Sequence, residues 1–247
     1  MSIEDFLENI TLEELEELKR SKELKNNKIP TFAFSKIRDI ELNKLFDITQ
    51  KIDNSIFIDW FNNTIKIDKK TISFLQELIL EEKDYISFYD QEDLKMRFLS
   101  PILRKVNFKT IDFRDFYDEK LTYKTDDFIL NGEVDFTISK SLRVAEKPYF
   151  FIQEFKRVEE YSNPRPQLIA ELIAGVELNN EITMKGAYIV GAIWNFVILE
   201  KLGKDTYQYF VSENFDSTKI NDLKNIYKNL MFVKNEIIEM IEKEKKQ

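Results

Sequence analysis

Two neighbouring strand-like segments hold an arrangement of charged residues that is typical of metal-assisted chemistry. Residues 132–138 contain Asp135, and residues 149–157 contain Glu154 and Lys156. Side chains two apart on a strand share a face, so Glu154 and Lys156 point the same way and Asp135 can lie beside them. Two carboxylates form an oxygen-lined site suited to Mg²⁺ or Mn²⁺, and a lysine can orient a water or a phosphate oxygen. The pattern predicts phosphodiester hydrolysis.

Glu-x-Lys recurs in polar helical segments of this chain, so the surroundings of Glu154 decide its meaning. Glu154 lies within a continuous apolar strand, where a charge is costly unless it is paired or metal-bound. The closest competitor is Asp68-Lys69-Lys70, which ends a predicted strand with Asp59 on the partner strand. The alternative without function is an ion pair between Glu154 and Lys156 on an edge strand.

The composition excludes several classes of chemistry. The 247 residues include no cysteine and no histidine, so disulfides, thiolate zinc sites, Ser-His-Asp triads and zinc deaminases are excluded. The net charge of −8 argues against an indiscriminate nucleic-acid binder. The charges of residues 91–170 nevertheless balance, with 14 basic and 14 acidic side chains.

Residues 186–199 are the longest apolar stretch and predict a buried hairpin, because 14 residues are too few to span a bilayer. The acidic start of the chain lacks the features of a signal peptide, and the absence of cysteine fits a reducing compartment. We therefore expect a cytoplasmic protein that does not bind membranes.

The hydrophobic pattern predicts an α/β fold with a mixed central sheet flanked by helices, a mainly helical N-terminal region and a long C-terminal helix. Two units are expected, residues 1–89 and 90–247. A helix near 164–180 would be the crossover between strands. In chain order we expect helix 3–25, hairpin 55–68, helix 71–82, helix 91–106 kinked or broken at Ser100, strands 110–117, 127–138 and 148–156, helix 164–180, strands 186–192, 195–201 and 206–212, and helix 216–245.

From about Asp90 to Ile198 the chain resembles the PD-(D/E)XK, or restriction-endonuclease-like, nuclease superfamily. It is most similar to the N-terminal nuclease domain of type I restriction subunits. Two positions depart from the pattern: Val134 stands where proline is common, and Glu171 stands where that group often has tyrosine. The matching residues are Glu92, Pro101-Ile102-Leu103, Gly132, Asp135, Phe136, Ile138, Glu154, Lys156 and Gln167.

The resemblance implies roles for these residues around Mg²⁺ or Mn²⁺. The metal ligands would be Asp135, Glu154 and the backbone carbonyl of Phe155. Lys156 would position the nucleophilic water or stabilise the charge of the transition state. Glu92 would hold a metal-bound water or a second ion, although an acid at a helix N-terminus is also favoured by the helix dipole.

Further residues have weaker indications. Gln167 would bind phosphate or support Lys156. Arg157 and Arg165 are candidate contacts to backbone phosphates. Glu133 would assist Asp135, and Tyr161 would stack on a base, although ordinary surface and packing roles fit both.

The resemblance implies a metal-dependent nuclease whose substrate is DNA, acting as a homodimer or with partner subunits. One alternative is a catalytically inactive, nuclease-like module that binds nucleic acid or partner proteins. Another is a dimerisation scaffold in which the apolar stripe of residues 216–245 pairs with a second copy, although such a stripe more often packs within its own chain.

Overall fold

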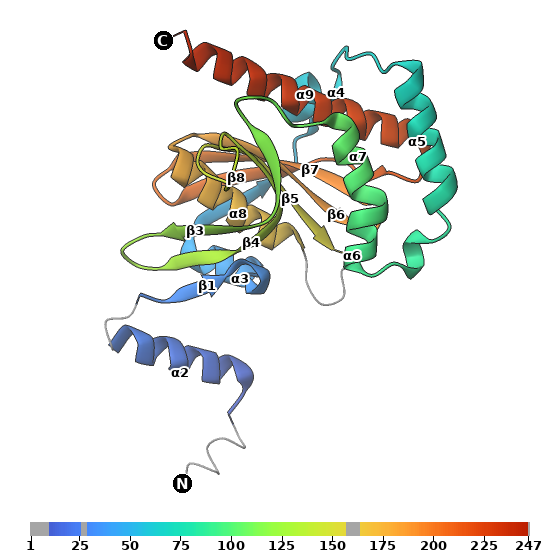
Figure 1. Cartoon of the computed structure of the whole chain (residues 1–247). Helices are drawn as coiled ribbons and strands as arrows, with labels where there is room; N and C mark the ends of the chain where they lie inside the picture. The colour runs from blue at the N-terminus through green and yellow to red at the C-terminus, as the bar shows by residue number, and fades with distance from the viewer. Residues whose placement is uncertain (1–9, 26–28, 157–163, 247) are drawn as a thin grey trace.

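The computed structural model describes residues 10–25, 29–156 and 164–246. In this part of the chain the strands form one mixed sheet, with helices packed against both faces (Figure 1). The predicted α/β class is confirmed, including the mixed sheet and the long C-terminal helix.

The main path through the sheet runs β1-β4-β5-β6-β7-β8-β2, with β3 paired to β4 and β9 paired to β7. The predicted strands from 127 to 212 are confirmed to within a few residues, whereas the strand predicted at 110–117 begins later and extends further. The bounds are β1 (Thr31–Ala33), β2 (Asp47–Lys51), β3 (Arg114–Lys124), β4 (Ile129–Ser139), β5 (Tyr149–Lys156), β6 (Thr183–Val190), β7 (Ile193–Gly203), β8 (Thr206–Val211) and β9 (Phe215–Asp216).

The helices lie mainly in two groups around the sheet, one over each face. Among the described residues no helix combines the length and the apolar character needed to cross a membrane. The bounds are α2 (Leu12–Lys25), η1 (Phe34–Lys36), α3 (Asp39–Leu45), η2 (Asn54–Phe57), α4 (Ile58–Phe61), α5 (Lys69–Glu82), η3 (Ile86–Phe88), α6 (Gln91–Asp93), η4 (Leu94–Leu99), α7 (Ser100–Val106), α8 (Pro164–Asn179) and α9 (Ile220–Glu244).

Two apolar cores lie on opposite faces of the sheet. Strand β5 shows the alternation: Phe151 and Phe155 pack in the core with α5, α7 and α9, while Ile152 packs in the core with α8. The apolar stripe of α9 belongs to the first core, where Leu223 and Leu230 are fully buried. The idea that this stripe pairs with a second copy of the chain is therefore wrong, because the chain's own sheet and helices cover it.

Helix α8 is the predicted crossover. It connects β5 to β6, and these strands pair in parallel, which requires such a connection. Gly186 on β6 permits the close approach of the helix. A Cβ atom there would lie 2.8 Å from the carbonyl oxygen of Ile152 and 3.0 Å from Leu172 Cδ2. The position of α8 over the sheet therefore depends on a missing side chain.

The hairpin predicted at 55–68 is wrong. Residues 54–61 form η2 and α4 instead, because Phe57 and Trp60 are spaced for one helical face and both are buried. The indole Nε1 of Trp60 donates a hydrogen bond to the carbonyl oxygen of Asn229 in α9 (2.9 Å). Asp68, considered above as a competing site, caps α5 by accepting a hydrogen bond from the backbone N–H of Thr71 (2.9 Å).

The helix predicted at 91–106 is not broken at Ser100. Segments α6, η4 and α7 are continuous, and η4 has π-helical hydrogen bonding. The backbone N–H of Ser100 donates to the carbonyl oxygen of Lys95, five residues earlier. Pro101 has no N–H to give, and the wider π-helical turn before it accommodates this loss without ending the helix.

Residues before 90 contribute two strands that the sequence did not predict. β1 pairs in parallel with β4, and β2 pairs in parallel with β8. Both are short and mostly exposed, so they lack the apolar alternation that marks a strand. Helix α2 begins at a capping box in which Thr11 and Glu14 bond each other. It lies apart from the sheet in Figure 1, and the rest of the helix predicted from residue 3 falls outside the described residues.

We predict that Gly186→Ala lowers the free energy of unfolding by about 1–3 kcal/mol, because the new Cβ must displace a backbone carbonyl and Leu172. Urea denaturation measures this. The control is Gly203→Ala, whose Cβ would meet nothing closer than 4.0 Å and should change stability by less than about 0.5 kcal/mol. Equal effects of the two changes would contradict the tight packing of α8.

Candidate active site

A gap in the pairing of β4 forms the candidate site. β3 pairs with one edge of β4 over residues 129–134 and 136–139. The other edge is shared, because β1 pairs with residues 129–131 and β5 pairs with residues 136–139. Within the described part of the chain, residues 132–135 therefore have no partner strand on that edge. An open pocket of about 540 Å³ lies there, and Asp135, Glu154, Lys156 and Gln167 are among its lining residues.

The gap arises where β5 leaves β4. The last paired residue of β5 is Gln153, and the strand continues beyond it against β6 alone. The backbone N–H of Phe155 would then lack an acceptor. Asp135 supplies one, since its Oδ2 accepts a hydrogen bond from that N–H at 2.7 Å. A buried N–H without a partner is costly, and the Asp135 carboxylate supplies that partner. We call the divergence of β5 from β4, at residues 132–135 and 154–156, the fork; Asp135 closes it and lies at its centre.

Glu154 and Lys156 lie on the α8 face of β5, as their spacing predicts. The side chain of Glu154 is buried, and its Oε1 forms an ion pair with Lys156 Nζ. Lys156 remains 15% exposed, so its ammonium can reach the pocket. Glu154 Oε2 is buried and has no hydrogen-bond donor among the described residues.

Asp135 and Glu154 both line the pocket, and Asp135 is close enough for its charge to act on the carboxyl of Glu154. Burial, followed by the charge of Asp135, raises the pKa of Glu154 to about 8. Burial also raises the pKa of Asp135, although the Phe155 N–H and Lys156 act in the opposite direction. Burial disfavours the charged form of Lys156, but Glu154 and Asp135 outweigh it and raise the lysine pKa. Two adjacent carboxyl groups and one ammonium leave an excess of negative charge, which a proton or a cation must balance.

Helix α8 adds two polar side chains to this group. Gln167 lines the pocket and is 3% exposed, and Glu171, one turn later, is fully buried. Gln167 Nε2 donates a hydrogen bond to Glu171 Oε1 at 3.0 Å. Sequence reasoning noted Glu171 only as a departure from a pattern. Its position inside the apolar run of residues 168–176 was the available signal, because an acid there must serve a buried polar group.

A second lysine approaches from the opposite side of the fork and was not anticipated. Lys95 in η4 is 4% exposed and forms an ion pair with Asp118 of β3. Asp118 has a φ of 54°, and the β3–β4 pairing skips this position, between the pairs Tyr117–Phe136 and Glu119–Val134. The charge of Lys95 lowers the pKa of Asp135, against the larger effect of burial. A lysine on the same helical stripe as Phe98 was the sequence signal for this contact.

The residues at the fork fit one divalent cation held by two carboxylates and a backbone carbonyl. In a strand the N–H and C=O of one residue point to the same side. The Phe155 carbonyl therefore faces the β4 side, as its N–H does. The unpartnered Glu154 Oε2 is the kind of buried oxygen that a cation would satisfy. Within the described residues no group of three or more Asp, Glu, His or Cys side chains is placed to hold a metal, so a bound ion would need the carbonyl and water as further ligands.

The other predicted residues are placed as follows. Glu92 is exposed in α6 and does not line the pocket, whereas Glu133 does line it and is exposed. Arg165 in α8 is half-buried, donating hydrogen bonds to Asp39 of α3 (2.6 Å) and Gln50 of β2 (3.2 Å). A phosphate-binding role for Arg165 stays a prediction. The two predicted residues Arg157 and Tyr161 lie outside the described residues.

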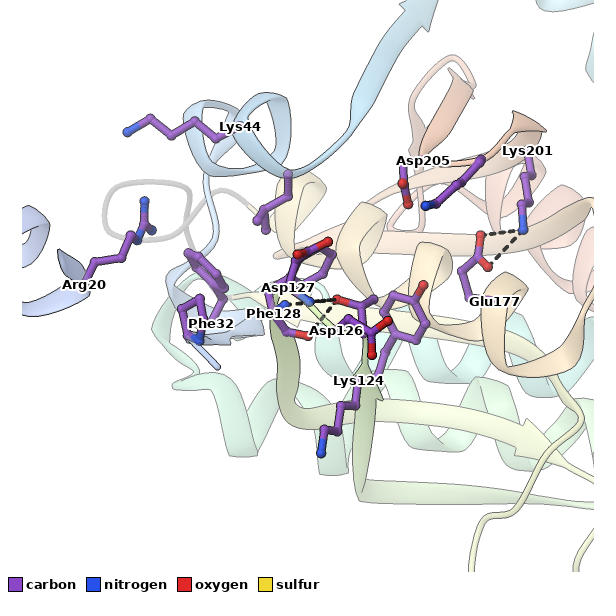
Figure 2. Close-up of a pocket in the computed structure, with 15 residues that line it drawn as sticks. Arg20, Phe32, Lys44, Lys124, Asp126, Asp127, Phe128, Glu177, Lys201 and Asp205 are labelled. Carbon is purple, nitrogen blue, oxygen red and sulfur yellow. Dashed lines mark hydrogen bonds and ion pairs between the residues drawn. The ribbon is translucent and has the colours of Figure 1, made fainter. Parts of the chain in front are cut away.

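A larger pocket of about 900 Å³ lies at the turns β3–β4 and β7–β8. Figure 2 shows that its basic side chains do not converge: Lys201 is paired with Glu177, while Lys44 and Lys124 extend in different directions. Arg20 stacks on the ring of Phe32. The pocket therefore holds mixed charges that are partly paired with each other, and the chemically organised site is the fork.

Comparison of the chain with protein-family models and with curated proteins found no match. The PD-(D/E)XK resemblance therefore stays a prediction that rests on the order and spacing of the motifs.

The raised pKa of Glu154 predicts how stability depends on pH without metal. The carboxyl of Glu154 titrates near its ordinary 4.5 when unfolded and at about 8 when folded. Folding therefore takes up a proton between these values, and the free energy of unfolding falls as the pH rises through this window. Glu154→Gln lacks this contribution, so its stability should fall less steeply.

Urea denaturation from pH 5 to 8.5 in EDTA measures these slopes. Part of the slope should persist in Glu154→Gln, because Asp135 and Glu171 also have raised pKa values. Lys156 contributes nothing in this window, since its raised pKa lies above it. The control Glu200→Gln, outside the pocket, should keep the wild-type slope, and an equal slope for Glu154→Gln would contradict the burial argument.

Proposed function

We propose that this protein is a metal-dependent nuclease that hydrolyses phosphodiester bonds, with DNA as its substrate. The observation that carries the proposal is the arrangement at the fork. Asp135 and Glu154 lie side by side, one of the two with an unpartnered buried oxygen, and Lys156 stands next to them at the edge of an open pocket.

Asp135, Glu154 and the Phe155 carbonyl would hold Mg²⁺ or Mn²⁺. When bound, such an ion polarises a phosphate oxygen and lowers the pKa of a coordinated water. The protein supplies the rest. Asp135 is anchored by the Phe155 N–H, which keeps its carboxylate at the fork. With Glu154 bound to the ion, the ammonium of Lys156 would be released to hold the attacking water or the developing negative charge on phosphate.

The lining of the pocket supports a phosphodiester as the substrate. Lys120 and Thr122 of β3, together with Asn131 of β4, add hydrogen-bond donors along the pocket. Among the described lining residues, the acids Glu133, Asp135 and Glu154 outnumber the two lysines. Without a cation this surface repels phosphate, so DNA binding at the site should depend on the divalent ion.

One observation favours a second candidate, a nuclease-like module that binds DNA or protein without cutting. In the structure Lys156 is paired with Glu154 and the described residues contain no group of three metal-ligating acidic side chains. If the charges of Glu154 and Lys156 balance each other in this ion pair, the pair needs no metal. In this case the fork would serve the stability of β5 and the protein would not hydrolyse DNA.

We predict that wild type nicks plasmid DNA or degrades single-stranded DNA with Mg²⁺ or Mn²⁺ but not with EDTA. Lys156→Ala should lower the rate by at least about 100-fold, because it removes the ammonium that pairs with Glu154 at the pocket. The matched control is Lys201→Ala, which breaks a Lys–Glu pair in the larger pocket and should cleave like wild type.

The outcomes separate the two candidates. Activity lost in Lys156→Ala but kept in Lys201→Ala would support the nuclease and its site together. A folded wild type that neither cleaves DNA nor binds Mn²⁺ in calorimetry would favour the non-cutting module. Cleavage that survives Lys156→Ala would show that the fork is not the site.

A further inference from the structure

Gln167 and Glu171 form a buried pair behind the fork. They are four residues apart on α8, so they lie one above the other on the helix. Both are almost inaccessible, with Gln167 3% and Glu171 0% exposed, yet Gln167 lines the pocket that contains Asp135 and Glu154. Glu171 is absent from the lining of this pocket, so its hydrogen-bonded contact with the lining runs through Gln167.

The hydrogen bond between them determines which end of the amide is available. Gln167 Nε2 donates to Glu171 Oε1 at 3.0 Å. An amide has its donor and acceptor on opposite arms. The acceptor, Gln167 Oε1, is buried and finds no donor among the described residues. A buried carbonyl oxygen without a donor indicates a missing partner, such as a water molecule or an ammonium group.

We propose that Glu171 is a positioning residue that fixes the amide of Gln167 so that its carbonyl oxygen, and not its NH₂ group, faces the pocket. Gln167 then acts as an acceptor, which can hold an attacking water or the ammonium of Lys156. It is not a donor to a phosphate oxygen. This inference rests on the proposed function for its catalytic meaning, but the orientation itself can be tested without it.

The electrostatics of Glu171 agree with this role. Burial and the nearby charge of Glu154 raise the pKa of Glu171 well above its ordinary value, opposed by the hydrogen bond from Gln167 and by Lys156. A neutral carboxyl still offers a carbonyl oxygen to an amide N–H. Glu171→Gln, which is neutral and keeps that oxygen, should therefore preserve the orientation, and Glu171→Met, of similar length but apolar, should abolish it.

The chain provides a matched control pair. Gln208 Nε2 donates to Glu200 Oε2 at 2.6 Å across β7 and β8. This pair is half-buried and lies outside the pocket. Glu200→Met should therefore disturb the amide of Gln208 and leave both Gln167 and DNA cleavage unchanged.

The orientation is tested by NMR on protein labelled with ¹⁵N-glutamine, which gives seven side-chain amides. Gln167→Met assigns the Gln167 signals by their disappearance. In wild type these NH₂ protons should exchange with water at least about tenfold more slowly than those of an exposed glutamine, because they are buried and bonded. Glu171→Gln should keep this protection and Glu171→Met should lose it, with melting curves confirming that each variant is folded.

Cleavage kinetics test the consequence. Glu171→Met should lower kcat about tenfold or more with KM changed less than about twofold, because the lost interaction acts on chemistry and not on DNA binding. Glu171→Gln should stay within about threefold of wild type, since it preserves the acceptor. Combining Glu171→Met with Gln167→Met should cost no more than Gln167→Met alone, because the two residues act as one unit.

The exchange measurement and the cleavage kinetics can contradict the proposal independently of each other. Fast exchange of the Gln167 amide in wild type would overturn the proposed orientation whether or not the protein cleaves DNA, and it needs no variant at position 171. A protected amide in a protein that does not cleave would support the orientation and reject the nuclease. Wild-type kcat in folded Glu171→Met would overturn the positioning role.

Discussion

The hydrogen bond from the Phe155 N–H to the Asp135 carboxylate is the interaction on which the site depends. Strand β5 leaves β4 after Gln153 and keeps only β6 as its partner. Where the hydrogen bonding between two strands ends inside a buried sheet, backbone N–H and C=O groups lose their partners, and each needs another hydrogen bond. Asp135 satisfies one of them from within the opening. The same side chain that stabilises the split also supplies a carboxylate to it, so the fold and the candidate chemistry share one residue.

The opening gathers more acid than base in a buried space. Among the described residues, Asp135, Glu154 and Glu171 lie near Lys156, and Lys95 approaches from the other side. Burial disfavours such an excess of negative charge. If no cation is bound, protonation of the carboxylates must neutralise part of it. A group of this kind weakens the fold at neutral pH and is retained at functional sites. The stiff apolar cores on both faces of the sheet compensate for it, with Phe155 and Ile152 packed on opposite sides of the strand that carries the acids.

Prediction succeeded where one strong periodicity governed the chain. The apolar run of β5, the crossover α8 and the stripe of α9 each bury a continuous face, and all three were expected from the spacing of their residues. It failed where the pattern was ambiguous. The short apolar pattern of residues 55–68 was ambiguous and was interpreted as two strands. The indole of Trp60 donates its hydrogen bond to α9, far along the chain, and this contact favours a helix. Strands β1 and β2 exist only because β4 and β8 offer them open edges.

The sequence by itself determined that Glu154 and Lys156 share a face, because the two-residue period of a strand leaves no other arrangement. The apolar run of residues 168–176 also held the signal for the burial of Glu171, although that residue was noted there only as a departure from a motif. Only the tertiary structure decided that Asp135 closes the fork, that Glu171 holds the Gln167 amide, and that Lys95, paired with Asp118, lies near enough to lower the pKa of Asp135. The contacts of Asp135 and Lys95 join residues of different elements, whereas the Gln167–Glu171 bond lies within α8. The position of all three relative to the pocket follows from how the sheet opens and where α8 packs over Gly186, which no local pattern records.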